Sequence, residues 1–167
     1  GGGSTVEVGL PQTHEGGYPM HPTLHGRRLA FISEGDIWLG ELPSPQSPRS
    51  PPSEIPQPSG EAAGAAAGAP PPQPQVCCAR LTVDGGCTTP CFSPDGARLA
   101  FCKAVGGGAE VFVLACGSYA AAPLQLTSLG EESEVVGWSP DGRLVLFRCA
   151  ASQPMSCRVG LWAVAAP

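Results

Sequence analysis

A ten-residue segment occurs twice in this chain and constrains its fold more than any other feature. FSPDGARLAF runs from Phe92 to Phe101, and WSPDGRLVLF runs from Trp138 to Phe147, 46 residues further on. The matched positions of the structural repeat are Phe92, Ser93, Pro94, Asp95, Gly96 and Phe101, and Trp138, Ser139, Pro140, Asp141, Gly142 and Phe147. A fixed period of roughly 20 to 50 residues is typical of architectures whose units pack against their neighbours.

The flanks of the two copies correspond as well. A short leader precedes each copy, at 79–86 and at 124–131, and an apolar run follows each, at 110–115 and at 159–164. The same parts therefore follow one another in the same order.

A degenerate third copy at 21–42 precedes these two. It keeps Gly26 and Phe31 at the five-residue spacing of the later copies, but its turn is two residues shorter. The strand that should complete this copy comes only after a tract rich in Pro, Ala and Gly, which we interpret as an insertion within a repeat.

The residues of one unit favour antiparallel strands joined by tight turns. In Ser-Pro-Asp-Gly, proline presets its own φ, aspartate can bond nearby backbone amides, and glycine takes a positive φ without steric cost. The runs RLAFIS, RLAFCK and RLVLFR after the turns are short and almost continuously apolar, as expected of strands covered on both faces.

Four short strands in each unit of this length indicate a β-propeller blade. We predict an all-β chain, a β-propeller fragment of about two and a half four-stranded antiparallel blades with a disordered insert in the first blade. A β-sandwich also uses short strands and tight turns, but it does not predict an in-register repeat of a whole turn and strand.

The insert stands out by composition, because 11 of the 20 prolines fall between Pro43 and Pro74. It holds too few large apolar residues to offset the entropy of ordering, so we expect a disordered spacer, with docking of its Pro-x-x-Pro motifs to an SH3-like partner as the alternative. The expected boundaries are a flexible N-terminal segment at 1–16, a first blade at 17–42 and 76–86, the insert at 43–75, a second blade at 87–132 and a partial third blade at 133–167.

Charge and hydropathy restrict the partners. The net charge is −5 with a single lysine, Lys103, so there is no basic face for nucleic acid. No apolar run approaches the roughly 18 to 20 residues that cross a bilayer, so we expect no membrane partner. The chain begins at Gly1 and stops after an apolar run, so we interpret it as a fragment.

No catalytic constellation is recognisable in the sequence. His14, His21 and His25 cluster near the first strand, and there is no Gly-x-Ser-x-Gly elbow, so we assign no catalytic residue. His21 and His25 are four apart, but Pro22 and Gly26 argue against a helical metal pair. Asp95 and Asp141 belong to different blades and are interpreted as turn-forming side chains.

The cysteines are interpreted mainly as reduced, small apolar residues. Cys77, Cys78, Cys87 and Cys91 form the most site-like group, but they are adjacent or four apart, which does not suit a zinc knuckle. We therefore expect no metal and no cofactor, and treat an opportunistic disulfide as a minor alternative.

The Ser-Pro-Asp-Gly repeat resembles the WD40-like blade repeat of TolB, of dipeptidyl peptidase IV-type propellers and of the tricorn protease. The first copy is more specific: Gly17-Tyr18, then HPTLHG at 21–26 and LAFISEGDIW at 29–38, is similar to the opening of tricorn-type proteases. VVGWSPDG at 135–142 is similar to the third blade of the same N-terminal six-bladed propeller.

This resemblance implies a parent protein that is a large cytoplasmic serine peptidase, which degrades short peptides and assembles as a homo-oligomer. The chain would be its non-catalytic propeller portion, serving substrate and product gating or assembly. Its partners would be the remaining blades and peptidase domains and peptides in transit. The alternative is a free-standing TolB-like interaction propeller without an enzymatic role. In both cases unpaired strand edges should make the isolated chain unstable or self-associating.

Overall fold

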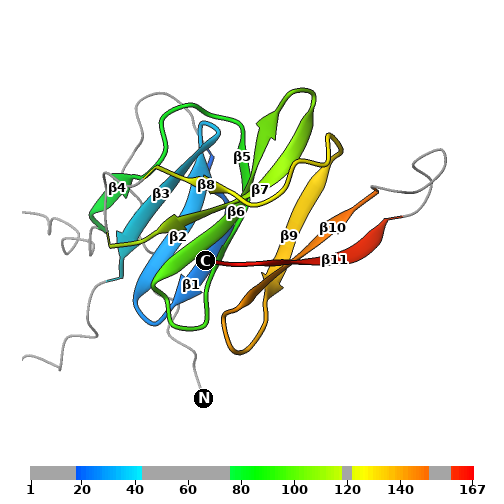
Figure 1. Cartoon of the computed structure of the whole chain (residues 1–167). Coiled ribbons are helices and arrows are strands. Elements are labelled where there is room, and N and C mark those ends of the chain that lie inside the picture. Colours follow the sequence, from blue (N-terminus) through cyan, green and yellow to red (C-terminus); the bar gives the residue numbers. More distant parts are fainter. Residues whose placement is uncertain (1–17, 43–75, 118–121, 151–158) are drawn as a thin grey trace, which may run out of the picture.

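The computed structural model describes residues 18–42, 76–117, 122–150 and 159–167. Every regular element in these ranges is a β-strand, and the strands form three antiparallel sheets (Figure 1). The all-β prediction is confirmed, and three sheets instead of two argue against the β-sandwich. The predicted flexible segment at 1–16 and the predicted disordered insert at 43–75 lie outside the described residues.

The three sheets follow one another along the chain. The first sheet has the order β1-β2-β3-β4, with β1 (Met20–His25), β2 (Arg28–Ser33), β3 (Asp36–Glu41) and β4 (Cys78–Arg80). The second has the order β5-β6-β7-β8, with β5 (Cys87–Phe92), β6 (Arg98–Val105), β7 (Gly108–Ala115) and β8 (Leu124–Gln125). The third has the order β11-β10-β9, with β9 (Ser133–Trp138), β10 (Leu144–Cys149) and β11 (Gly160–Ala165).

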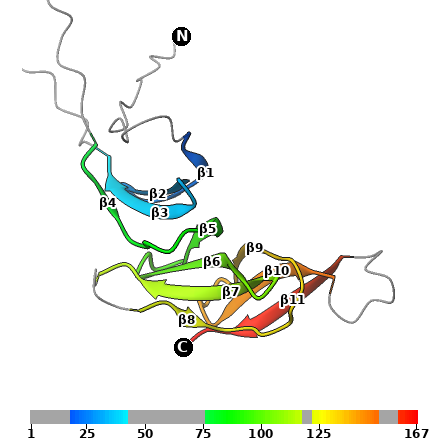
Figure 2. The ribbon, with the colours of Figure 1, turned by 90° about the horizontal axis from the view of Figure 1, so that it is seen from above.

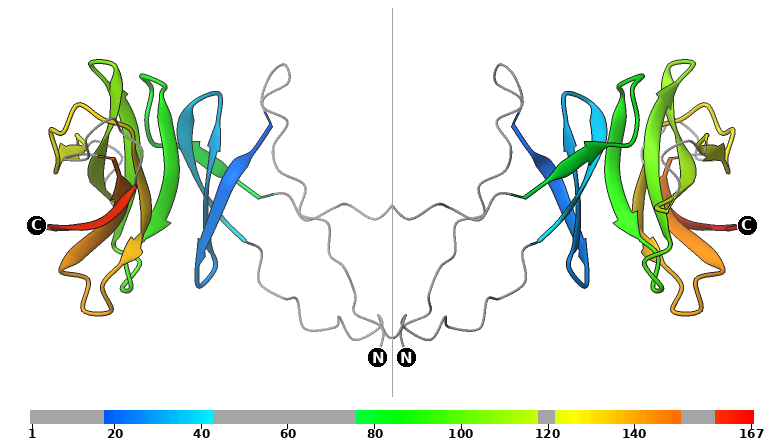
Figure 3. Two further views of the ribbon diagram at one scale, coloured as in Figure 1. Left: turned by 90° about the vertical axis from the view of Figure 1, so that its right-hand side faces the viewer. Right: turned by 90° about the vertical axis from the view of Figure 1, so that its left-hand side faces the viewer.

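The first strand of each sheet faces the first strand of the next, so β1, β5 and β9 lie side by side. Seen from above, the sheets succeed one another in chain order, with the second sheet between the other two (Figure 2). The side views show the same succession from opposite directions (Figure 3). This arrangement places three inner strands along one side of the molecule.

Two apolar cores fill the spaces between the sheets, and β6 serves both of them. Leu99 and Phe101 point into the first core, whereas Ala100 and Cys102 point into the second, and all four are fully buried. Successive side chains of a strand alternate between its faces, so a strand covered on both sides is apolar throughout.

The far face of the third sheet is different. In each sheet a phenylalanine of the second strand pairs with an aromatic residue of the third strand. The residue just before that aromatic partner is Ile37 in β3, Val111 in β7 and Leu161 in β11, so these three residues hold equivalent places. Ile37 and Val111 are fully buried, whereas Leu161 is 69% exposed. The third sheet thus keeps the apolar pattern of a covered face, but no described segment covers it.

None of the residues that the structure describes lies in a helix that could cross a membrane.

Candidate functional site

The repeated Ser-Pro-Asp-Gly turn is held by its own side chains. The amide of Gly96 donates to the carbonyl of Ser93 at 2.8 Å, and Gly96 has a φ of 69°. Asp95 Oδ1 accepts from the Ser93 hydroxyl at 2.6 Å and from the Ala97 amide at 3.0 Å. The Ser93 hydrogen bond, followed by the Ala97 amide, lowers the pKa of Asp95 below its ordinary value.

The second turn has the same bonds. Asp141 accepts from the Ser139 hydroxyl and from the Arg143 amide, and these two bonds, in that order, lower its pKa. Asp95 and Asp141 follow β5 and β9, in two different sheets, and each carboxylate serves its own turn. Their geometry is that of turn formers and not of an acid and base pair.

An arginine from the preceding sheet also donates a hydrogen bond to each turn. Arg28 Nη1 donates to the carbonyl of Gly96 at 3.2 Å, and Arg98 Nη2 donates to that of Gly142 at 2.9 Å. The Arg98 guanidinium also lies 5.1 Å from the centre of the Trp138 ring. Sequence reasoning left Arg28 unassigned, although the shared Arg-Leu-Ala-Phe of 28–31 and 98–101 was a usable signal.

Two buried carboxylates, which sequence reasoning also missed, tie each outer strand to its sheet. Thr82 Oγ1 donates to Asp36 Oδ1 at 2.7 Å, and Thr127 Oγ1 donates to Glu110 Oε2 at 2.6 Å. Asp36 and Glu110 are 1% and 3% exposed. We call these two arrangements the carboxylate clasps.

Backbone amides complete both clasps. Gly85 donates to Asp36 Oδ1 at 3.0 Å, and Leu129 and Gly130 each donate to Glu110 Oε1 at 2.7 Å. These amides belong to the links that lead to the next sheet, so the clasps fix where each link departs.

The first clasp includes an ion pair between Arg80 and Asp36. Burial by itself raises the pKa of Asp36, but the hydrogen bonds from Thr82, Arg80 and Gly85 outweigh it and hold the pKa below the ordinary value. The carboxylate is therefore the form that the fold stabilises.

A shallow groove of about 280 Å³ runs over the inner strands β1, β5 and β9. His21 and Thr89 lie in it with positive φ of 50° and 47°, each directly before a proline and each at a β-bulge. Positive φ in such residues is uncommon and costly, which makes both positions candidates for a functional role. Glu134, the acid of the groove, is paired with Arg148, so the groove has no unpaired carboxylate among its described residues.

The lining of this groove is His21, Pro22, Thr23, Thr89, Pro90, Cys91, Glu134, Val135 and Val136.

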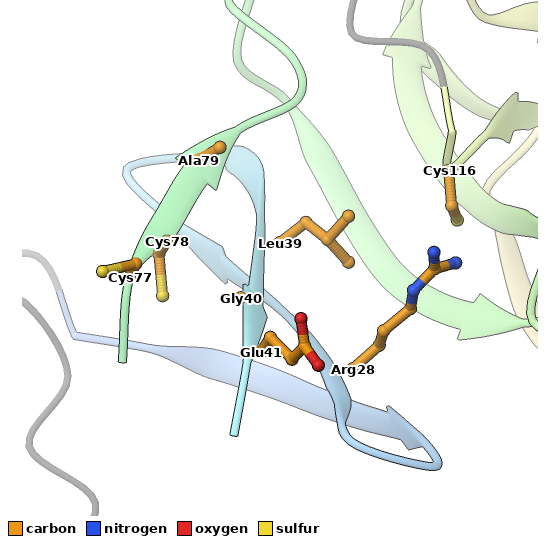
Figure 4. Close-up of a pocket in the computed structure, with 8 residues that line it drawn as sticks. All are labelled: Arg28, Leu39, Gly40, Glu41, Cys77, Cys78, Ala79 and Cys116. Atoms are coloured by element: carbon orange, nitrogen blue, oxygen red, sulfur yellow. The ribbon is translucent and has the colours of Figure 1, made fainter. Parts of the chain in front are cut away.

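A second cavity of about 380 Å³ opens between the outer parts of the first two sheets (Figure 4). Arg28 and Cys116 lie on one side of it and Cys77 and Cys78 on the other, with the Cys77 sulfur turned away from Arg28 and Cys116 (Figure 4). Burial raises the pKa of the Cys78 and Cys116 thiols, so neither is an activated nucleophile.

The cysteines and histidines that the sequence offered as candidate site residues do not lie together in one site. Cys77 and Cys78 line the outer cavity, Cys87 lies in the first core, and Cys91 lies on an inner strand. Within the described ranges no three His, Cys, Asp or Glu side chains are placed to hold a metal. The free thiols include those of the four candidates, Cys77, Cys78, Cys87 and Cys91. His25 Nε2 donates to the carbonyl of Pro94 at 3.0 Å, whereas His14 lies outside the described residues.

Comparison with solved structures identifies the fold. The crystal structure of the tricorn protease matches with a TM-score of 0.60 and 18% identity, over 87% of this chain and 12% of that chain. TolB from Acinetobacter baumannii matches with a TM-score of 0.58 and 15% identity, over 88% of this chain and 29% of that one. The acylaminoacyl peptidase of Pyrococcus horikoshii matches with a TM-score of 0.50 and 12% identity, over 81% and 17%.

No protein-family model matches the chain, and no curated protein matches it. The chain spans only a small part of the proteins whose structures it matches. Together with the three antiparallel sheets and their side-by-side inner strands, these likenesses show that the chain has the fold of a partial TolB/tricorn-like β-propeller.

Proposed function

We propose that this chain is the non-catalytic propeller portion of a tricorn-type serine peptidase that degrades peptides in the cytoplasm. The observation that carries the proposal is the likeness to the tricorn protease over 87% of this chain. The specific opening at 21–38 agrees with it. The blades would be those expected from the sequence, at 17–42 with 76–86, at 87–132 and at 133–167, within a six-bladed ring of a homo-oligomeric parent.

The far face of the third sheet supports a larger propeller. Leu161 is 69% exposed there, whereas Ile37 and Val111, which hold the same place in the first two sheets, are fully buried by a neighbouring sheet. A further blade that packs on this face would bury Leu161, as the second sheet buries Ile37 and the third sheet buries Val111.

Peptide gating would act through the inner strands. The groove over β1, β5 and β9 is the surface that faces the centre of the ring in a closed propeller, and His21 and Thr89 stand at its bulges. In this role the groove guides peptides and does not cleave them. This fits the carboxylates of Asp95 and Asp141 and the ring of His25, which form hydrogen bonds with the turns.

The reading frame of the complete transcript tests the parent. A tricorn-type parent predicts further blades, a second propeller and a peptidase domain downstream. A frame with neither a second propeller nor a peptidase domain would refute it. The TolB likeness favours the second candidate, a free-standing interaction propeller, which predicts further blades followed by a stop.

The gating role has its own test in the complete protein. Thr89→Trp narrows the groove and should slow the degradation of peptides while leaving a small chromogenic substrate unaffected. The control is Leu129→Trp, which enlarges a side chain that is already 39% exposed outside the groove. Equal effects of both variants on peptides would count against gating at the inner strands.

A further inference from the structure

The cavity between the outer parts of the first two sheets combines two opposite charges with an apolar wall. It measures about 380 Å³, and its lining includes the cation of Arg28, the anion of Glu41 and the apolar side chains of Leu39 and Ala79 (Figure 4). A cavity of this size with a few placed polar groups is typical of a small-molecule site. Both sheets that form it are described, so it does not depend on an open face or edge.

The guanidinium of Arg28 is held in place and has donors to spare. Its Nη1 donates to the carbonyl of Gly96 at 3.2 Å, and it makes no other hydrogen bond or ion pair with the described residues. The next residue of the same turn holds the opposite side of the guanidinium's surroundings, because the amide of Cys116 donates to the carbonyl of Ala97 at 2.9 Å. The Nε and Nη2 donors remain, and these two share the edge of the guanidinium that binds a carboxylate through two parallel bonds.

The equivalent arginine of the next sheet has less capacity left. Arg98 also bonds to a turn carbonyl, but the ring of Trp138 lies 5.1 Å from its guanidinium. By register the place of Trp138 is held in the second sheet by Phe92, which packs against His25 with ring centres 6.1 Å apart. Among the described residues no aromatic ring covers the guanidinium of Arg28, and this is where the cavity lies.

Glu41 supplies the opposite charge. It pairs with Arg28 in the register of β2 and β3, but the two side chains form no ion pair. The nearest cation to Glu41 is Arg27, at 3.8 Å, and Arg27 already donates two hydrogen bonds to the carbonyl of Leu42. A carboxylate that is 68% exposed and so loosely paired keeps its capacity to accept from an ammonium group.

We propose that this cavity is a binding site for a small zwitterion, namely a free α-amino acid or a dipeptide with an apolar side chain. The carboxylate of the ligand accepts two hydrogen bonds from Arg28, its ammonium group donates to Glu41, and its side chain packs against Leu39 and Ala79. The inference goes beyond the proposed function, since it concerns binding by this chain whether or not its parent is a peptidase.

The probes are L-leucine and the dipeptide leucyl-leucine. Equilibrium dialysis against the purified chain should show saturable binding with a Kd on the order of 0.1 to 1 mM, as expected of so small a ligand. Whichever of the two binds more tightly identifies the size of the ligand. N-acetylleucine lacks the ammonium group and leucinamide lacks the carboxylate, so each should bind roughly tenfold more weakly than leucine.

Two variants of the chain locate the site. Arg28→Lys keeps the charge but not the two-donor edge, and should weaken the binding of leucine roughly tenfold or more. Glu41→Gln keeps the shape of the side chain and should abolish the preference for leucine over N-acetylleucine. The matched controls are Arg143→Lys and Glu132→Gln, which change exposed residues outside the cavity and should leave binding unaltered.

Circular dichroism verifies that each variant keeps its strands. Because Glu41 is exposed and loosely paired, Glu41→Gln should fold as the wild type does, so it decides the test if Arg28→Lys unfolds. Absence of saturable binding of both zwitterions would overturn the proposal. So would equal affinity of the wild type for leucine and N-acetylleucine, or a preference that Glu41→Gln retains in full.

Discussion

Thr127 donates its hydroxyl hydrogen to the buried carboxylate of Glu110 across 2.6 Å, and this bond ties the link to the third sheet onto β7. The same carboxylate accepts the amides of Leu129 and Gly130. A loop that would otherwise leave the sheet freely is therefore fixed at its start.

Removing this clasp should destabilise the chain. Glu110→Ala leaves two amides and a hydroxyl without their acceptor, which should lower the free energy of unfolding by about 2 to 3 kcal/mol. Urea denaturation followed by circular dichroism measures the change. Glu131→Ala removes an exposed carboxylate of the same link and should change stability by less than about 0.5 kcal/mol. Equal losses in the two variants would show that the clasp has no special role.

The first clasp should make stability depend on pH. The pKa of Asp36 is lower in the folded state than in the unfolded state, so its carboxylate contributes to the free energy of unfolding. This contribution is fully present above the unfolded-state pKa of about 3.9 and is lost as the pH falls through the folded-state pKa. Asp36→Asn should therefore be less stable than the wild type at about pH 6, with a gap that narrows towards about pH 2.

Urea denaturation at several pH values measures this gap. Thr89→Val removes a hydroxyl that accepts the amide of Val135 at 3.3 Å and introduces no titrating group, so its gap to the wild type should stay nearly constant. A gap for Asp36→Asn that also stayed constant would contradict the account.

The two turn glycines provide a matched pair. Both have positive φ, 69° at Gly96 and 70° at Gly142, so alanine should cost about 1 to 2 kcal/mol at either position. A Cβ at Gly96 would also lie 2.2 Å from Nδ1 of His25, whereas the nearest atom to one at Gly142 is 3.4 Å away. Gly96→Ala should therefore cost more than Gly142→Ala in thermal or urea unfolding, and the reverse order would be inconsistent with this packing.

Arg98, which lies between the second and third sheets, should contribute more to the free energy of unfolding than the exposed Arg143. Arg98→Ala removes the hydrogen bond to Gly142 and the contact with Trp138, with an expected loss of about 2 to 3 kcal/mol. Arg143→Ala is the control, because that side chain is 85% exposed, and its effect should stay within about 0.5 kcal/mol. Similar unfolding midpoints for both variants would argue against an arginine bridge between sheets.

The sequence was sufficient for features that are local. Pro94 and Gly96 act within one turn, and the apolar run of β6 reports that both faces of that strand are covered. These features depend on residues a few positions apart, and the repeat made them visible twice.

The carboxylate clasps, and the arginine hydrogen bonds between sheets, could not be predicted in the same way. Asp36 and Thr82 lie on opposite sides of the insert, and the acid is aspartate in one sheet and glutamate in the next. The bulges at His21 and Thr89 depend on how the inner strands pair, which a single sequence does not specify.

The central claim is that these residues form successive blades of a larger propeller, with a third sheet whose far face is covered by no described segment. Amide hydrogen exchange resolved by segment tests it most directly in the purified chain. The account predicts slowest exchange in β6 and β7, which lie between two cores, and fastest exchange in β10 and β11, in a sample that elutes broadly on size exclusion. Protection of β10 and β11 equal to that of β6 and β7, in a sharp monomer with a cooperative melt, would contradict it.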